Sequence, residues 1–234
     1  MNARVVVVTG AVGGIGTEIT KAFEELGDVV VGLDIASGFD VTDPAACRQA
    51  TREILDRHGR VDVLCNNAGV GAAGDVVSAE PEDWQLVFAV NVLGAAHMTA
   101  AVLPSMRAAG SGAIVNTCSI VASVGFADRV VYSASKGALL AMTRAIAADE
   151  ARRGIRVNSV SPATVDGPWV RRNAGLSSDP EQFLRSMRRR QPLGQLISAG
   201  AVARAVTYLA DPDLEVSGID LPVDGGLSGI RLTD

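Results

Sequence analysis

Short runs of Val, Ile and Leu, separated by longer stretches with helical periodicity, constrain the fold of this chain more than any other feature of its sequence. The runs are continuously apolar rather than alternating, which is typical of strands buried on both faces of a parallel sheet. Regular alternation of such strands with helices predicts a doubly wound α/β fold. The candidate strands are residues 4–10, 28–34, 61–67, 112–119, 155–162 and 218–226.

The stretches between these runs carry apolar residues at helical spacing. One apolar face of a first helix would be formed by Ile15, Ile19, Ala22, Phe23 and Leu26. No linker, internal repeat or low-complexity tract interrupts the pattern, so residues 1–234 are predicted to form a single domain with a Rossmann-type doubly wound parallel sheet. The segment 167–195 contains six arginines and several glycines and prolines, and we expect it to fold over a site as a substrate lid. The remaining helices are predicted at residues 44–57, 82–108, 131–152 and 198–210.

Composition and charge disfavour several classes of function. The net charge of −5 disfavours a nucleic-acid-binding protein, whose affinity would depend on a basic surface. No uninterrupted apolar run approaches the roughly 20 residues that span a bilayer, and the apolar run at 5–8 is too short for a signal peptide. We therefore expect no membrane association. The cysteines are far apart and not in metal-ligand spacing, so we expect no metal site, buried free thiols and a cytoplasmic location: Cys47, Cys65 and Cys118.

A glycine-rich segment, TGAVGGIG (9–16), follows the first predicted strand and opens the first predicted helix. In this position Gly10 would permit a tight turn, Gly14 would let a pyrophosphate approach the backbone, and Gly16 would allow close packing of helix and strand. The unpaired N–H groups of the helix N-terminus suit phosphate groups. The alternative is an ordinary glycine-rich turn between a strand and a helix.

Asp34 favours the cofactor interpretation of this turn, because it ends the next strand 20 positions after Gly14. A carboxylate at that place can accept hydrogen bonds from the hydroxyls of the adenosine ribose. It would also repel the additional phosphate of NADP, and residues 5–20 contain no Arg or Lys to compensate. The sequence therefore predicts NAD as the cofactor.

The interval between Asp34 and Asp40 is unusually short, with only five residues between the two aspartates. A crossover to a parallel neighbouring strand normally needs about a dozen residues. We therefore predict that the helix that usually follows the second strand, and most of the edge strand after it, are deleted, leaving six substantial strands and at most a one- or two-residue edge bridge. The side chain of Asp40 and the backbone of Val41 would then reach the adenine. Alternatively, Asp40 is a simple turn or cap residue.

Several further motifs resemble the classical short-chain dehydrogenase/reductase family over nearly the whole chain: TGAVGGIG (9–16), NNAG (66–69), NVLG (91–94), Ser119, YSASK (132–136) and VDGG (223–226). The resemblance implies a homotetramer built from the long helices at 82–108 and 131–152. It implies a catalytic tetrad of Asn91, Ser119, Tyr132 and Lys136. It also implies a cofactor site formed by Gly10, Gly14, Ile15, Gly16, Asp34, Asp40, Val41, Asn67, Ala68, Gly69, Tyr132, Lys136, Pro162 and Val165.

The chemistry of hydride exchange gives the tetrad its residue types. Interconversion of a secondary alcohol and a ketone needs a group that moves a proton to and from the oxygen. Free tyrosine has a pKa of about 10, and the ammonium of Lys136, four positions along the same helical face, would favour the phenolate of Tyr132. In the family this lysine also holds the nicotinamide ribose. Ser119 would hydrogen-bond the substrate oxygen, and Asn91 would keep a water connected to the lysine.

Some positions depart from the family pattern. Gly167 replaces a Thr that often contacts the nicotinamide carboxamide, which leaves backbone groups of Val165 for that contact. Pro162 is followed by Ala rather than the usual Gly. Cys118 occupies a position where a second serine is common, and we interpret it as a packing residue. The histidines match no motif and are predicted to be surface or packing residues: His58 and His97.

The sequence thus predicts an NAD-dependent oxidoreductase that acts on a secondary alcohol or ketone in a small hydroxylated substrate. Residues 183–196 loosely resemble branches of the family that oxidise sugars or sugar acids. The alternative is a reductase of 3-oxoacyl thioesters, a branch that commonly prefers NADP and docks an acidic carrier protein. Asp34 argues against a preference for NADP, whereas three arginines could dock an acidic carrier protein: Arg129, Arg171 and Arg172. An NAD-binding pseudoenzyme is a further alternative, which the intact tetrad disfavours.

Overall fold

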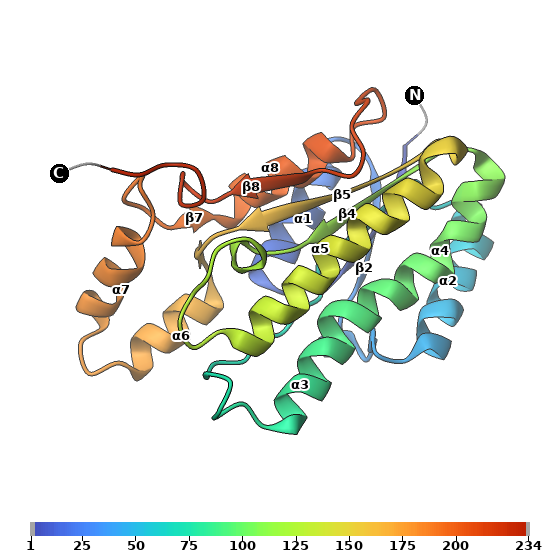
Figure 1. Ribbon diagram of the computed structural model, residues 1–234. Helices are drawn as coiled ribbons and strands as arrows, with labels where there is room; N and C mark the ends of the chain where they lie inside the picture. The colour runs from blue at the N-terminus through green and yellow to red at the C-terminus, as the bar shows by residue number, and fades with distance from the viewer. Residues whose placement is uncertain (1–2, 233–234) are drawn as a thin grey trace.

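A six-stranded parallel sheet with helices on both faces forms the centre of the computed structural model, which describes residues 3–232 (Figure 1). The strand order is β2-β1-β3-β4-β5-β8, and every neighbouring pair is parallel. The predicted doubly wound sheet and its six strands are therefore confirmed. The strands are β1 (Val5–Thr9), β2 (Val29–Leu33), β3 (Val63–Asn66), β4 (Gly112–Thr117), β5 (Ile155–Pro162) and β8 (Asp220–Val223).

Both faces of this sheet are buried, which explains why its strands are continuously apolar. Successive residues of a strand point to opposite faces, so Val5 and Val7 of β1 enter one hydrophobic cluster and Val6 and Val8 enter another. Helices α2 (Pro44–His58), α4 (Ala95–Ala109) and α5 (Val130–Glu150) cover the first face, and α1 (Gly14–Glu25) and α8 (Ala199–Leu209) cover the second.

The connection after β2 is short, as predicted, and β2 itself is the edge strand of the sheet. The interval between Asp34 and Asp40 contains a single 3-10 turn, Ile35–Ser37, in place of an α-helix. The chain then enters α2 at Pro44, behind the N-cap residue Asp43, and returns directly to β3. The end of β2 lies beside the glycine turn because β2 pairs with β1, and the N–H of Gly10 donates to the carbonyl oxygen of Leu33 (2.8 Å).

The helix predicted at 82–108 consists of three parts: α3 (Pro81–Phe88), a π-helical turn (Ala89–Gly94) and α4. By length and composition, the run Pro81–Ala109 is apolar enough to cross a membrane. Its α4 part, however, packs Met98, Val102 and Met106 against the sheet with no solvent exposure. The α4 part is therefore a core helix of the α/β fold. The π-helical turn was not predicted, because one additional residue per turn leaves the apolar spacing almost unchanged.

Two helices form the segment that was predicted to be a lid, α6 (Pro168–Leu176) and α7 (Pro180–Arg189). They extend from the end of the sheet at which β5 terminates (Figure 1). A two-residue parallel pair that the sequence pattern did not indicate joins the base of this segment: β6 (Val165–Asp166) with β7 (Ile197–Ser198). The role of the segment as a substrate lid stays a prediction.

Candidate active site

The glycine turn between β1 and α1 packs tightly against the loop that follows β3. A Cβ added to Gly10 would lie 2.8 Å from Ala68 Cα, and one added to Gly16 would overlap the carbonyl oxygen of Gly10. The side chain of Asn67 donates hydrogen bonds to the carbonyl oxygens of Thr9 (3.2 Å) and Gly10 (3.1 Å). Larger residues therefore do not fit in this turn, and the structure brings the predicted residues Asn67 and Ala68 against it.

The N-terminus of α1 has no side-chain cap. Its N-cap residue, Gly13, offers no side chain, so the N–H groups of the first turn, from Gly14 to Gly16, have neither a capping side chain nor a full set of helical partners. Such a terminus attracts anions through these donors and through the helix dipole. A Cβ added to Gly14 would lie 3.0 Å from Cδ of Pro168, so the start of α6 lies directly beside this terminus.

Asp34 is held between the end of β2 and the glycine turn by two backbone hydrogen bonds. Its Oδ2 accepts from the N–H of Val12 and its Oδ1 from the N–H of Ala36, both at 2.9 Å. The residue is only 9% exposed. Each oxygen of an ionised carboxylate can accept about two hydrogen bonds, so Asp34 retains capacity for ribose hydroxyls. An uncapped helix N-terminus and a prealigned carboxylate on neighbouring elements therefore fit a dinucleotide.

Asp40 and Val41 lie in the loop before α2. Oδ1 of Asp40 accepts hydrogen bonds from the N–H and the hydroxyl of Thr42, both at 2.8 Å. The side chain of Val41 is buried against Gly94, and its carbonyl oxygen lies 3.1 Å from Nδ1 of His97. His97 thus has the packing role that was predicted. Asp40 acts as a turn residue, and contact of Asp40 and Val41 with adenine stays a prediction.

Tyr132 and Lys136 lie on one face of α5 at the end of the sheet where β4 terminates. Nζ of the buried Lys136 donates to the carbonyl oxygen of Thr117 (2.7 Å) and lies 5.8 Å from the centroid of the Tyr132 ring. Ser119 follows β4, and its hydroxyl lies 3.5 Å from the carbonyl oxygen of Pro162 at the end of β5. The carboxyl ends of two neighbouring strands therefore supply Ser119 and Pro162 to the same region as the Tyr–Lys pair.

Asn91 lies within the π-helical turn, a feature that often occurs at functional sites. Its side chain accepts from the N–H of Val70 (2.8 Å) and donates to the carbonyl oxygen of Val70 (2.9 Å) and to the hydroxyl of Ser135 (3.0 Å). A Cβ added to Gly69 would lie 3.3 Å from Oδ1 of Asn91 and 3.4 Å from Nζ of Lys136. The structure therefore brings Gly69, Asn91 and Lys136 together, whereas a water held by Asn91 stays a prediction.

Comparison with known proteins identifies the family. A family model described as enoyl-(acyl carrier protein) reductase matches residues 10–228. Dehydrogenase/reductase SDR family member 6 of Rattus norvegicus is 35% identical to the chain, and the match covers 97% of this chain and 98% of the rat protein. The chain belongs to the short-chain dehydrogenase/reductase family.

Solved structures of similar proteins carry either nicotinamide cofactor. The ligand-free aldohexose dehydrogenase of Thermoplasma acidophilum has a TM-score of 0.92 at 32% identity, covering 99% of this chain and 98% of that one. An NAD⁺-bound xylitol dehydrogenase (TM-score 0.88, 29% identity) covers 95% of this chain and 98% of its own. The match to ElxO with NADP bound (TM-score 0.89, 26% identity) covers 96% of this chain and 98% of ElxO. This short-chain dehydrogenase/reductase is thus an oxidoreductase-family protein with a nicotinamide cofactor site.

A buried amide network beneath the site of this short-chain dehydrogenase/reductase was not predicted. Nδ2 of Asn66 donates to the hydroxyl of Thr99 (3.1 Å) and to Oδ1 of Asn116 (2.9 Å), and Nδ2 of Asn116 donates to the hydroxyl of Thr143 (2.8 Å). The network joins β3, β4, α4 and α5 just below the active residues. The signal in the sequence was an Asn in each of two largely apolar strand runs, because most buried amides have hydrogen-bond partners. Within the described residues, however, Oδ1 of Asn66 has none.

The cysteines of the short-chain dehydrogenase/reductase are free and buried, as predicted. Burial raises the pKa of the Cys118 thiol to about 11, so the group stays protonated near neutral pH. Its neighbours in a small hydrophobic cluster include Leu139 and Leu140, which agrees with a packing role. Within residues 3–232, no group of three or more His, Cys, Asp or Glu side chains is placed to hold a metal ion.

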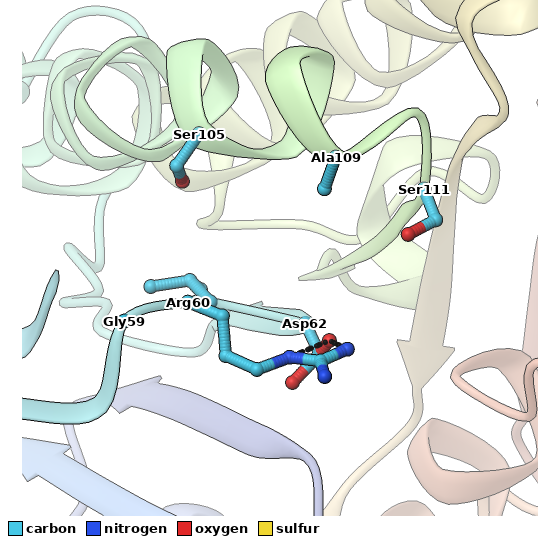
Figure 2. A pocket seen from close by; sticks show the side chains of 7 residues that line it. Gly59, Arg60, Asp62, Ser105, Ala109 and Ser111 are labelled. Carbon is cyan, nitrogen blue, oxygen red and sulfur yellow. Dashed lines mark hydrogen bonds and ion pairs between the residues drawn. The ribbon is translucent and has the colours of Figure 1, made fainter.

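A hollow of about 380 Å³ lies at the opposite end of the sheet, where the central strands β3 and β4 begin (Figure 2). Figure 2 shows Arg60 and Asp62 paired on one side and Ser105 and Ala109 of α4 on the other. Nε of Arg60 donates to Oδ1 of Asp62 (2.8 Å), and the other carboxylate oxygen accepts from the N–H of Val5 (2.7 Å). These charged groups lie at the amino ends of the central strands, whereas the predicted tetrad of the short-chain dehydrogenase/reductase lies at the carboxyl ends.

Proposed function

We propose that the protein is an NAD-dependent oxidoreductase that interconverts a secondary alcohol and a ketone. The observation that carries the proposal is the pairing of Lys136 with Tyr132 on α5, with Nζ anchored to the Thr117 carbonyl at 2.7 Å. When bound, the nicotinamide accepts or delivers the hydride. The Tyr132 hydroxyl moves the proton at the substrate oxygen, and Ser119 orients that oxygen by a hydrogen bond. Lys136 places its ammonium 5.8 Å from the centroid of the Tyr132 ring.

Asp34 supports NAD rather than NADP as the cofactor. Its carboxylate is positioned by Val12 and Ala36 at the end of β2, where a ribose 2′-hydroxyl could donate to it and a 2′-phosphate would be repelled. The exposed residue that follows it, Ile35, offers no positive charge to offset that repulsion.

A small polyhydroxylated substrate, such as a sugar or a sugar alcohol, is the substrate class we favour. Two of the similar solved structures are described as an aldohexose dehydrogenase and a xylitol dehydrogenase. The segment 167–195, with α6 beside the glycine turn, would act as the lid over this substrate.

A screen of substrates tests this function. The protein is incubated with NAD and with aldohexoses, sugar acids, polyols, simple secondary alcohols and 3-hydroxy acids, and NADH is followed by its absorbance, with Tyr132→Phe as the control. We expect turnover of at least one polyhydroxylated substrate that the control lacks. A parallel assay follows the consumption of NADPH with 3-oxoacyl thioesters. Turnover confined to that assay would favour the thioester reductase instead, and no turnover in either assay in the presence of tight NAD binding would favour a pseudoenzyme.

Assembly as a homotetramer in the cytoplasm completes the proposal. The exposed leucines on the run 81–109, Leu86 (57% exposed) and Leu93 (51% exposed), would be covered by a second copy of the long helices. Free buried thiols suit a reducing compartment. Light scattering coupled to size-exclusion chromatography checks the assembly, and a monomer would contradict it.

A further inference from the structure

Residues 162–168, which connect β5 to the lid, lie beside the proposed nicotinamide site and lack the side chain that often anchors the carboxamide. Gly167 occupies that position in an extended conformation (φ −161°, ψ −176°). The nearest atom to a Cβ added there is the Val165 carbonyl oxygen at 4.0 Å, so the space for a larger side chain is open. A carboxamide bound here, as the family resemblance implies, would depend on the backbone of Val165, whose direction other contacts must set.

Two hydrogen bonds fix the peptide group that precedes Val165. The carbonyl oxygen of Thr164 accepts from the N–H of Ile197 (3.0 Å) and from Nε2 of Gln191 (3.2 Å). A carbonyl oxygen has two lone pairs, so both are used. Because a trans peptide group is planar, its N–H points opposite to its C=O. Fixing the Thr164 carbonyl therefore also fixes the direction of the Val165 N–H.

Gln191 is one of two buried amides within the described residues whose side-chain oxygen has no hydrogen-bond partner, Asn66 being the other. It directly follows the lid helices, is only 1% exposed, and its Oε1 has no hydrogen-bond partner within the described residues. A buried amide with an unpartnered acceptor costs stability, so an apolar side chain of similar size would serve better if only packing mattered. The next residues are tied down separately, since the N–H of Leu193 donates to the carbonyl oxygen of Gly225 (3.1 Å).

We propose that Gln191 is a positioning residue for the nicotinamide ring. Through the Thr164 carbonyl it directs the Val165 N–H that would hold the carboxamide, and it thereby takes over the orienting task left open by the missing side chain at Gly167. The proposal rests on the cofactor binding proposed above but on neither the substrate nor the choice between NAD and NADP.

Binding of whole and truncated cofactor tests the proposal. In the full-length protein, Gln191→Leu should raise the Kd for NAD about fivefold to tenfold in calorimetric titration, as expected for one lost hydrogen bond. The Kd for ADP-ribose, which lacks the nicotinamide, should change by less than about twofold on the same grounds. Thr51→Val is the matched control, because it removes another buried side-chain bond, to the Cys47 carbonyl (2.9 Å), far from the site. It should leave both Kd values unchanged.

Equal weakening of NAD and ADP-ribose by Gln191→Leu would mean a purely structural role and would overturn the proposal, as would no change in either. If the Leu variant does not fold, Gln191→Met provides the same comparison. Adding Gly167→Thr to the Leu variant should restore NAD binding, and a folded double variant with no recovery would also count against the proposal. If the wild type binds NADP better than NAD, the same comparison is made with NADP and 2′-phospho-ADP-ribose, and only the NAD assignment fails. A wild type that binds no dinucleotide refutes both proposals.

Discussion

Replacing Asp34 should change the cofactor preference of the protein more than any other single substitution. The carboxylate lies at the end of β2, tied to the N–H groups of Val12 and Ala36 at 2.9 Å, and cannot easily turn away from the ribose position. We therefore expect the wild type to prefer NAD clearly. Asp34→Ser should shrink the preference mainly by weakening NAD, whose ribose loses its acceptor.

The magnitude follows from the repulsion between Asp34 and a 2′-phosphate. Two like unit charges at about 4 Å repel by roughly 4 kcal/mol at an effective dielectric of 20. Two N–H donors already share the charge of Asp34, and the pocket rim is near solvent, so a net preference of about 2–3 kcal/mol is reasonable. At 1.4 kcal/mol per decade this equals roughly a 30- to 150-fold preference for NAD in kcat/KM.

Ile35 allows the reverse change to be built. It is 70% exposed at the first position of the 3-10 turn, so Ile35→Arg can be accommodated without repacking the core. Adding it to Asp34→Ser should raise kcat/KM with NADP by pairing the 2′-phosphate. Ile35→Gln, which has no charge, is the matched control and should leave NADP use low.

The assay measures kcat/KM with both cofactors on one shared substrate, below the melting temperature of every variant. This precaution is needed because Asp34→Ser removes the carboxylate that accepts hydrogen bonds from Val12 and Ala36. A serine hydroxyl can still cap Ala36, so we expect the loss of the other bond to cost about 1–3 kcal/mol of folding stability. Equal kcat/KM values for NAD and NADP in the wild type would refute the reasoning, because they would mean that Asp34 points away from the ribose.

Three further results are expected. Tyr132→Phe should abolish turnover and leave the Kd for NAD nearly unchanged, because it removes only the proton-transfer hydroxyl. Lys136→Ala should impair both turnover and NAD binding. A kcat retained by the Phe variant would contradict the assignment of the tetrad. Gly16→Ala should displace the glycine turn, because the added Cβ would overlap the Gly10 carbonyl oxygen. Losing hydrogen bonds from the displaced N–H groups to the cofactor should cost roughly 1.4 kcal/mol or more, which weakens NAD binding more than tenfold. An unchanged Kd in calorimetric titration would argue against the turn as a cofactor site. A hydrogen bond from the guanidinium of Arg107 lowers the pKa of Glu150 below its value in the unfolded chain. The stability that this carboxylate contributes is therefore present above about pH 4.3 and is lost as the pH falls through the pKa of the folded state. The melting temperature of Glu150→Gln should accordingly lie below that of wild type at pH 7 and approach it in acid; a gap independent of pH would exclude the ion pair as its cause.

Features encoded within short stretches of the chain were predictable from the sequence. The strands followed from apolar runs such as 5–8, because burial on both faces leaves no room for alternation. The missing crossover followed from the five residues between Asp34 and Asp40, since chain length alone limits what can be built there. The family resemblance singled out Tyr132 and Lys136, and helical spacing predicted that they lie on one face, because it places residues four apart on the same side.

Features that depend on which distant segments meet were decided only by the tertiary structure. The π-helical turn at Ala89–Gly94 aims Asn91 at Val70, and nothing in the local periodicity indicates its additional residue per turn. Gln191 reaches a carbonyl 27 positions away, at Thr164, and this contact forms where the chain after the lid helices returns and β7 pairs with β6. A local sequence pattern indicates the structural preference of one segment only. The partner of a buried polar group depends on which distant segments pack together, and a local pattern does not contain that information.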